Sequence, residues 1–547
     1  MSTRGRILLI IALILLGIGE YGWSITKAMS LFAVPLDGRP QLARQHARRV
    51  PALSRSGFTP AEVHAFLDKV RAAEAVADPL QRCLDYPDPP RSHWSPATVE
   101  AYCHYYLQKT ISFHEAQELI QSGHAAELDS RLAQALQAQR TRPESRGLLD
   151  HTYFSAFDNG SFDVRQTLDA WKRASPDSAF AFAASGSAYV AMAWKARGGA
   201  YINDTPQSNI DAMNRLLMEA DSDLERALAL NPQVTPTYVA MMRAGSLSLG
   251  GSYTRRAVQR GLAVAPDNYS IYGTLSSVEE PRWGGSLEAM DRVARQAQAH
   301  VKRNPLLAIL LSAEPAYRYD VCNCRSSASW PAYPTVFDNV ASTALLSSAG
   351  KAASENGHPE LAVIYLSEAL RFQPGALGTR RQRDTDLAYV GEPRMALDDA
   401  NRLIADNPHD ARNYLLRGNV YRSLMDTRHA EEDLEHALAM DPDDIDVLGP
   451  LGSLYIDQTH EWDKAWDITD RIIRKYPGSP AGWVMRATIQ ESQPRAGLDD
   501  TYRYFVEHFG HDPSMQWQIA HIREVLAKAK APAEQVSKSN QADGSGR

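Results

Sequence analysis

The sequence has 547 residues, of which 44% are hydrophobic and 22% are charged, enough for several ordinary domains or one extended repeat structure. Its formal net charge of -7 argues against a general nucleic-acid binder. The four cysteines are too few for a disulfide-rich scaffold and too scattered for a zinc finger. The totals therefore indicate a folded protein whose partner is not nucleic acid.

The first 39 residues contain one long apolar stretch. Residues 7–26 lie between Arg6 and Lys27 and carry a single charge, Glu20. A helix of that length spans about 30 Å, the thickness of a bilayer core. We therefore expect residues 1–39 to hold a membrane helix, with the bulk of the chain exported. A cleaved signal peptide is the alternative, since arginines precede the apolar run.

Residues 40–146 predict helices without a repeat. Thr59 and Glu62 have the spacing of a capping box, in which each residue satisfies the backbone N–H of the other. Cys83 and Cys103 flank a proline-rich loop that separates two of the expected helices. In an exported protein these two cysteines form a disulfide; the alternative is a pair of buried thiols.

Three segments rich in tryptophan and glycine distinguish residues 147–305. They are LDAWKRASP from Leu168, AMAWKARG from Ala191 and RWGGSLEAMDRVA from Arg282. Together they resemble the bacterial domain of unknown function 4034, and the resemblance implies an architecture without implying any chemistry. The residues that carry it are Trp171, Trp194, Arg197, Gly198, Trp283, Gly284 and Gly285. Tryptophans at helical spacing usually belong to a core, and a cleft for sugars or peptides is the alternative.

The strongest pattern runs from Ala411 to Asp444. One predicted helix there carries Tyr414, Gly418 and Tyr421, and a second carries Ala430, Leu434 and Ala437, with small residues where two helices approach closely. This pattern resembles the tetratricopeptide repeat, a helical hairpin with a period of about 34 residues that serves as a binding scaffold. Prolines that end such hairpins recur at Pro232, Pro266, Pro374, Pro408, Pro442, Pro477 and Pro513.

The same period predicts the organisation of the remaining chain. Residues 147–305 form a tetratricopeptide-like pair with about 22 residues inserted between its helices, so that the second helix runs from Met218 to Leu230. Residues 306–340 are a linker or packed connector, residues 341–530 are regular repeats, and the polar tail 531–547 is disordered. The predicted fold is all-α: an α-solenoid of tetratricopeptide-like hairpins with an amino-terminal membrane helix.

The sequence contains no catalytic constellation and no fingerprint for a nucleotide, metal or other cofactor. Cys322 and Cys324 lack a second ligand pair at fixed spacing, which favours a buried or bridged pair over a metal site. We therefore expect a scaffold that is not an enzyme. The alternative is a cell-envelope enzyme with its active site in residues 147–305.

The helix positions that face the groove in tetratricopeptide repeats carry basic and amide side chains here. Counting from Thr343, Leu377 and Ala411 places Lys351, Arg381, Arg412, Asn419 and Arg422 on that face. Such a face favours an acidic protein or peptide partner, and solvated charges paired with neighbours are the alternative. The expected protein is a single-pass scaffold of the bacterial inner membrane whose bulk lies in the periplasm.

Overall fold

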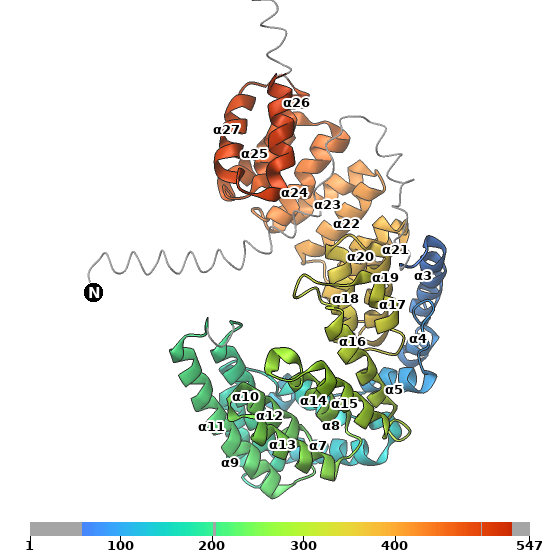
Figure 1. The fold of residues 1–547 in the computed structure, drawn as a ribbon, viewed down its shortest axis with the longest axis vertical. Coiled ribbons are helices and arrows are strands. Elements are labelled where there is room, and N and C mark those ends of the chain that lie inside the picture. Colours follow the sequence, from blue (N-terminus) through green and yellow to red (C-terminus); the bar gives the residue numbers. More distant parts are fainter. Residues whose placement is uncertain (1–56, 201–203, 494, 528–547) are drawn as a thin grey trace, which may run out of the picture. The chain divides into compact units, whose positions relative to one another are not determined.

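The computed structural model describes residues 57–200, 204–493 and 495–527, and all regular structure within them is helical (Figure 1). The predicted all-α class is therefore confirmed. The apolar stretch in residues 1–39 and the tail 531–547 lie outside the described residues. Of the helices that are described, none is long and apolar enough to cross a membrane.

The chain divides into two compact units. The amino-terminal unit contains the described residues up to Ala352 together with residues 364–376, and the carboxyl-terminal unit contains residues 353–363 and the described residues from Leu377 onward. Helices α18 (Thr343–Glu355) and α19 (Pro359–Phe372) therefore contribute to both units.

The amino-terminal unit is built from antiparallel helical hairpins packed in succession (Figure 1). Their apolar faces meet in continuous buried clusters, as expected for stacked hairpins that cannot bury those faces alone. Its helices before α18 are α3 (Pro60–Glu74), α4 (Pro79–Asp85), α5 (Pro96–Leu107), α6 (Phe113–Gln121), α7 (Ala125–Thr141), α8 (Leu148–Ala156), α9 (Asp163–Ala174), α10 (Ala179–Arg197), α11 (Gln207–Leu230), α12 (Pro236–Ala244), α13 (Gly251–Val264), α14 (Tyr269–Val278), α15 (Leu287–Gln298), α16 (Ala313–Arg318) and α17 (Tyr333–Val336).

The capping box at the start of α3 is present. The Thr59 hydroxyl accepts the Glu62 N–H at 3.2 Å, and the Glu62 carboxylate accepts the Thr59 N–H at 2.8 Å. At α6 only half of the device forms, because Ser112 caps the helix while Glu115 forms an ion pair with Arg131 at 2.7 Å. The two helix starts were thus readable from sequence, although the partner of the second glutamate was not.

Helices α10 and α11 contain the long insertion. At Gly186 of α10, an added Cβ would lie 2.6 Å from the Leu224 side chain of α11, so a side chain at this position would clash. The prediction placed the inserted residues in the turn and began the second helix near Met218, which is wrong. The insertion lengthens both helices: α10 continues to Arg197 and α11 begins at Gln207.

The segment around α5 closes onto residues far along the sequence. The Trp94 indole donates to the Phe337 carbonyl at 2.9 Å, and its ring is stacked on Phe372 of α19 at a centroid distance of 6.3 Å. The Tyr102 hydroxyl accepts the Thr343 N–H at 3.0 Å. Phe337, within residues 306–340, therefore contacts helices of the amino-terminal unit.

The four cysteines form two disulfides of different character. Cys83 and Cys103 join α4 to α5, are separated by 20 positions and are buried. Cys322 and Cys324 are separated by two positions in the loop after α16 and are exposed.

The carboxyl-terminal unit repeats one hairpin. The predicted first helices begin at Leu377 and Ala411, as expected from the 34-residue period. Its helices are α20 (Leu377–Tyr389), α21 (Pro393–Asp406), α22 (Ala411–Ser423), α23 (Thr427–Met440), α24 (Ile445–Leu454), α25 (Trp462–Lys475), α26 (Pro480–Ser492) and α27 (Leu498–Phe509).

The hairpins of this unit close at a small residue on the first helix. An added Cβ at Gly418 would lie 2.9 Å from Leu434 Cγ and 3.3 Å from the Ala430 carbonyl oxygen. The hairpin of α20 and α21 departs from this rule, because Asp384 stands at the glycine position and Ala400 at the leucine position, and both are fully buried.

The hairpin of α24 and α25 contains one extra residue, as its longer proline spacing indicated. A π-helical turn, Tyr455–Thr459, follows α24, and His460 then takes a left-handed conformation with φ 56°. The π turn holds one more residue than an α-helical turn, so α25 begins one position later in its repeat than α23 does.

Candidate partner-binding face

The five predicted binding residues lie in three places. Lys351 lies on α18 within the amino-terminal unit and is exposed. Arg381 and Arg412 come together at one carboxylate, and Asn419 and Arg422 come together one helical turn apart on α22.

Arg381 links α20 to the start of α22. Its guanidinium donates to the Asn413 side-chain oxygen from Nε at 3.1 Å and from Nη2 at 2.8 Å, and Nη2 also contacts the Asp410 carboxylate. Asn413 is buried and donates to the Leu403 carbonyl at 2.9 Å. With 17% of its side chain exposed, Arg381 joins consecutive repeats to one another rather than offering a charge to a partner.

Asp410 is the common acceptor that organises this end of the face. Its side chain caps α22 by accepting the Arg412 N–H at 3.1 Å, and it pairs with Arg412 Nε at 3.1 Å. Arg412 keeps 69% of its side chain exposed. Hydrogen bonds and ion pairs to both arginines hold the pKa of Asp410 below its ordinary value, against the raising effect of burial.

Arg422 forms a second cluster with residues of three successive first helices. Its Nη1 donates to Asn419 Oδ1 at 3.1 Å, while its Nε has no acceptor among the described residues. The side chain is half-buried near Tyr389, the last residue of α20, and near Asp457 in the π turn after α24. Tyr389 is 64% exposed. We call Tyr389, Asn419, Arg422 and Asp457 the Arg422 cluster.

The charges in this cluster are only partly compensated. Removal from water lowers the pKa of Arg422, and the Asp457 carboxylate acts in the opposite direction. Burial also disfavours the charged form of Asp457 and so raises its pKa, while the nearby Arg422 and His460 lower it. Arg422 remains a cation, so the cluster presents a poorly solvated positive charge beside an exposed aromatic ring and a single carboxylate.

A charged layer also joins the two helices within each of two hairpins. Arg417 forms a two-pronged ion pair with Asp433, with both N–O distances 2.7 Å. In the preceding hairpin Arg383 pairs with Asp399 in the equivalent place. The Asp384 Oδ1 lies 3.8 Å from the Arg383 Nε. The pKa of Asp384 is well above its ordinary value because the carboxyl group is buried and faces the Asp399 carboxylate.

The tryptophans of the 147–305 region separate into two groups. Trp171 is fully buried and donates its indole N–H to Asp129 at 3.1 Å, as expected of a core residue. Trp194 is 40% exposed, and its ring lies 5.3 Å from that of Trp283. The Arg197 guanidinium carbon lies 5.9 Å from the Trp194 ring centroid and 6.0 Å from the Trp283 ring centroid. Residues from two distant stretches, the end of α10 and the 3-10 turn Pro281–Trp283, therefore form one surface cluster.

Sequence counting missed the acceptors that decide what each arginine does. Asp410 was readable, because aspartate immediately before a helix is a common N-cap. Asp457 was not, because the π turn moves it relative to the regular repeat. Within the described residues, no group of three histidine, cysteine, aspartate or glutamate side chains is placed to hold a metal ion.

A comparison with protein-family models identifies one segment of the chain, and this segment coincides with a helical hairpin of the structure. The family model described as the tetratricopeptide repeat matches residues 411–444, which are α22, α23 and the turn that follows. Residues 411–444 thus match the tetratricopeptide repeat and fold as the hairpin of α22 and α23. The predicted span is confirmed at both ends.

A solved structure titled as the TPR domain of P58(IPK) is 13% identical to the chain. The match covers 75% of this chain and 99% of that chain, with a TM-score of 0.20. No curated protein matches the chain. The resemblance of residues 147–305 to the domain of unknown function 4034 stays a prediction.

Proposed function

We propose that the protein is an interaction scaffold that holds an acidic partner protein or peptide against the first helices of its carboxyl-terminal repeats. Tetratricopeptide-like folds are suited to binding proteins and peptides, because stacked first helices form an extended surface. The observation that carries the proposal is the Arg422 cluster. The Arg422 side chain is half-buried beside the exposed Tyr389, and its Nε, which is itself buried, has no acceptor among the described residues.

A carboxylate from the partner fits this arrangement chemically. It would accept from Arg422 and from the amide of Asn419, while Tyr389 offers an apolar ring to the adjoining chain. Asp457 is the competing anion. The partner carboxylate and Asp457 therefore repel each other while both are attracted to Arg422, and binding is weakened by salt.

The experiment separates two arginines of the same helix. The Arg422→Gln variant keeps a polar side chain, although a shorter one, and removes the charge. We expect it to lose the acidic partners captured from a solubilised membrane fraction. The matched control is Arg412→Gln, which removes the same charge from an exposed position and should retain them. Asp457→Asn should strengthen capture. Identical partner sets for both arginine variants, with the fold intact by circular dichroism, would exclude this face.

We also propose that the scaffold is anchored in the bacterial inner membrane through residues 7–26, with its bulk in the periplasm. The length of that apolar stretch supports the anchor. The buried Cys83–Cys103 disulfide supports export, because disulfides persist in oxidising compartments. After a carbonate wash of native membranes, the protein should stay in the pellet. A soluble chain that begins near Glu20 would show that the segment is cleaved.

A further inference from the structure

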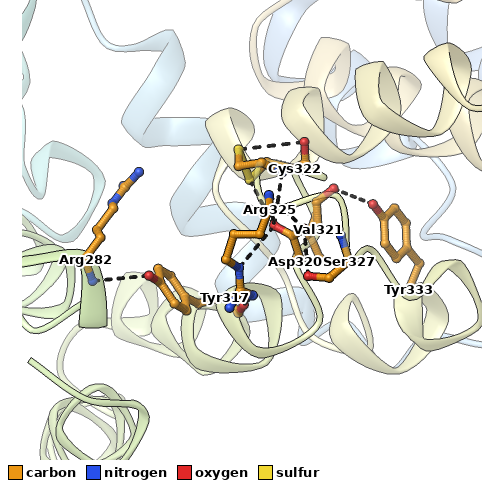
Figure 2. Close-up of polar contacts among 9 residues, drawn as sticks. Arg282, Tyr317, Asp320, Val321, Cys322, Arg325, Ser327 and Tyr333 are labelled. Carbon is orange, nitrogen blue, oxygen red and sulfur yellow. Dashed lines mark hydrogen bonds and ion pairs between the residues drawn. A yellow bond between two sulfur atoms is a disulfide. The ribbon is translucent and has the colours of Figure 1, made fainter. Parts of the chain in front are cut away.

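The loop of residues 319–329, between α16 and the short 3-10 turn Trp330–Ala332, carries the Cys322–Cys324 disulfide on its surface (Figure 2). The Ser329 N–H donates to the Tyr319 carbonyl at 3.1 Å and closes the base of the loop. Both cysteines are exposed. The disulfide is therefore open to a reaction partner.

Asp320 holds the shape of this loop from inside. Its buried carboxylate accepts backbone N–H groups from Cys324 at 3.0 Å, Arg325 at 3.1 Å and Ser327 at 3.0 Å, and also the Ser327 hydroxyl at 3.1 Å. Burial alone would raise the pKa of Asp320, yet the donors from Ser327 and Arg325 hold it below its ordinary value. The ionised carboxylate is thus the centre of a hydrogen-bonded loop (Figure 2).

The two sides of the loop are anchored to the helical core. The buried Tyr333 hydroxyl donates to the carbonyl of Val321, which is itself buried. On the other side the Arg325 guanidinium donates to the Tyr317 carbonyl and lies 5.0 Å from the Tyr317 ring centroid. None of these contacts passes through a sulfur atom, so we expect them to hold the loop when the disulfide is reduced.

The comparison with Cys83–Cys103 shows what this second disulfide does not do. A cross-link restricts the unfolded chain more when it closes a longer loop, and Cys322 and Cys324 are only two positions apart. The Cys83–Cys103 bridge spans 20 positions, joins two helices and is buried. The exposed pair therefore has little to contribute to folding, while its loop keeps the two sulfur atoms together in either redox state.

We propose that Cys322 and Cys324 form a thiol–disulfide exchange site that oxidises a dithiol on a partner polypeptide. A partner thiolate attacks one sulfur, the S–S bond breaks, and a mixed disulfide forms while the other cysteine leaves as a thiolate and takes a proton from water. The second partner thiolate then attacks the mixed disulfide. The partner leaves with a disulfide, and two electrons remain on the chain as two thiols.

The test uses reduced, unfolded ribonuclease A as the dithiol probe. The oxidised full chain is mixed with the probe under argon, free thiols are trapped by alkylation, and peptides are identified by mass spectrometry. We expect Cys322 and Cys324 to appear as alkylated thiols, with two probe thiols lost for each pair, while Cys83 and Cys103 stay bridged. Probe oxidation should fall to the protein-free background when Cys322 and Cys324 are both changed to Ser. An unreduced pair in the wild-type chain, or unchanged probe oxidation in the double variant, overturns the proposal.

A stability measurement separates exchange from a structural role. The variant with both residues changed to Ser should melt within about 2 °C of the parent, because the Asp320 contacts remain. A much larger drop would show that the bridge is a structural cross-link and would also overturn the proposal. The variant with Cys83 and Cys103 both changed to Ser is the matched control, and it should keep probe oxidation. Should it fail to fold, the peptide map of the wild-type chain still assigns the reactive pair.

Discussion

Two neighbouring hairpins of the carboxyl-terminal unit, α20–α21 and α22–α23, fill the same contact in opposite ways. In α22–α23 the first helix contributes Gly418 and the second contributes Leu434. In α20–α21 the first helix contributes Asp384 and the second contributes Ala400, both fully buried. The larger side chain therefore lies on the second helix in α22–α23 and on the first helix in α20–α21. The repeat therefore requires a combined volume across the pair rather than a glycine at one fixed position.

The exchange has an electrostatic consequence that the glycine hairpin avoids. Both hairpins contain an arginine–aspartate pair between their helices, Arg417 with Asp433 and Arg383 with Asp399. Only in α20–α21 does a further carboxylate, Asp384, lie beside that pair. Burial keeps a proton on Asp384 at pH values where an exposed aspartate is ionised. The two hairpins thus share a geometry and differ in their response to pH.

The largest expected effect comes from moving the carboxylate into the glycine hairpin. Gly418→Asp should lower the free energy of unfolding by about 3 to 5 kcal/mol, because it crowds Leu434 and buries a polar group. Adding Leu434→Ala recreates the volumes of the other hairpin, so the double variant should be more stable than Gly418→Asp alone. Urea unfolding of the two single variants and the double variant completes a double-mutant cycle. If the stability losses of the single variants simply add in the double variant, the shared-volume explanation is contradicted.

A smaller effect concerns Asp386, whose burial raises its pKa to about 7 against hydrogen bonds from Ser354 and Gln382. The folded chain keeps this proton where the unfolded chain has lost it, so the stabilisation is present below about pH 4 and is lost as the pH rises towards 7. Asp386→Asn keeps an acceptor for Ser354 and removes the titration. When the pH is raised from 4.5 to 7.5, the free energy of unfolding of this variant should fall by about 2 to 3 kcal/mol less than that of the parent.

The control for this pH experiment is Asp398→Asn, which removes a carboxylate from the exposed face of α21. Its stability should fall with pH in parallel with that of the parent. A parallel curve for Asp386→Asn as well would place the pH dependence elsewhere in the chain.

The smallest effects compare two arginines that share Asp410. Arg381→Ala removes hydrogen bonds to both Asn413 and Asp410 and should cost about 1 to 3 kcal/mol. Arg412→Ala removes a mostly exposed ion pair and should cost less than about 0.5 kcal/mol. Each change deletes one positive charge, so thermal melts at equal ionic strength measure the contacts rather than net charge. Equal losses would contradict the difference in their surroundings.

The sequence predicted most of the fold because the hairpin pattern is local. Proline spacing and small residues located the helices from α18 onward, including the start of α22 at Ala411. The pattern is weaker in α20–α21, where Asp384 occupies the position at which it expects a small residue. The candidate site was less predictable, because the acceptors of Arg381 and the carboxylate that faces Arg422 come from neighbouring repeats. Counting within one helix identifies a face but does not show which charges are already paired.

The π turn after α24 has a consequence for how such a chain can change in length. One additional residue is absorbed inside Tyr455–Thr459. A Cβ added at Gly452 would still lie 3.1 Å from the Ile468 side chain, much as one added at Gly418 would lie 2.9 Å from that of Leu434. A second π turn, Gly245–Leu249, follows α12 in the amino-terminal unit. Single-residue insertions at the ends of first helices are therefore accommodated within one turn. The hairpins downstream keep their packing partners, so an insertion there alters the local surface without changing the contacts between helices.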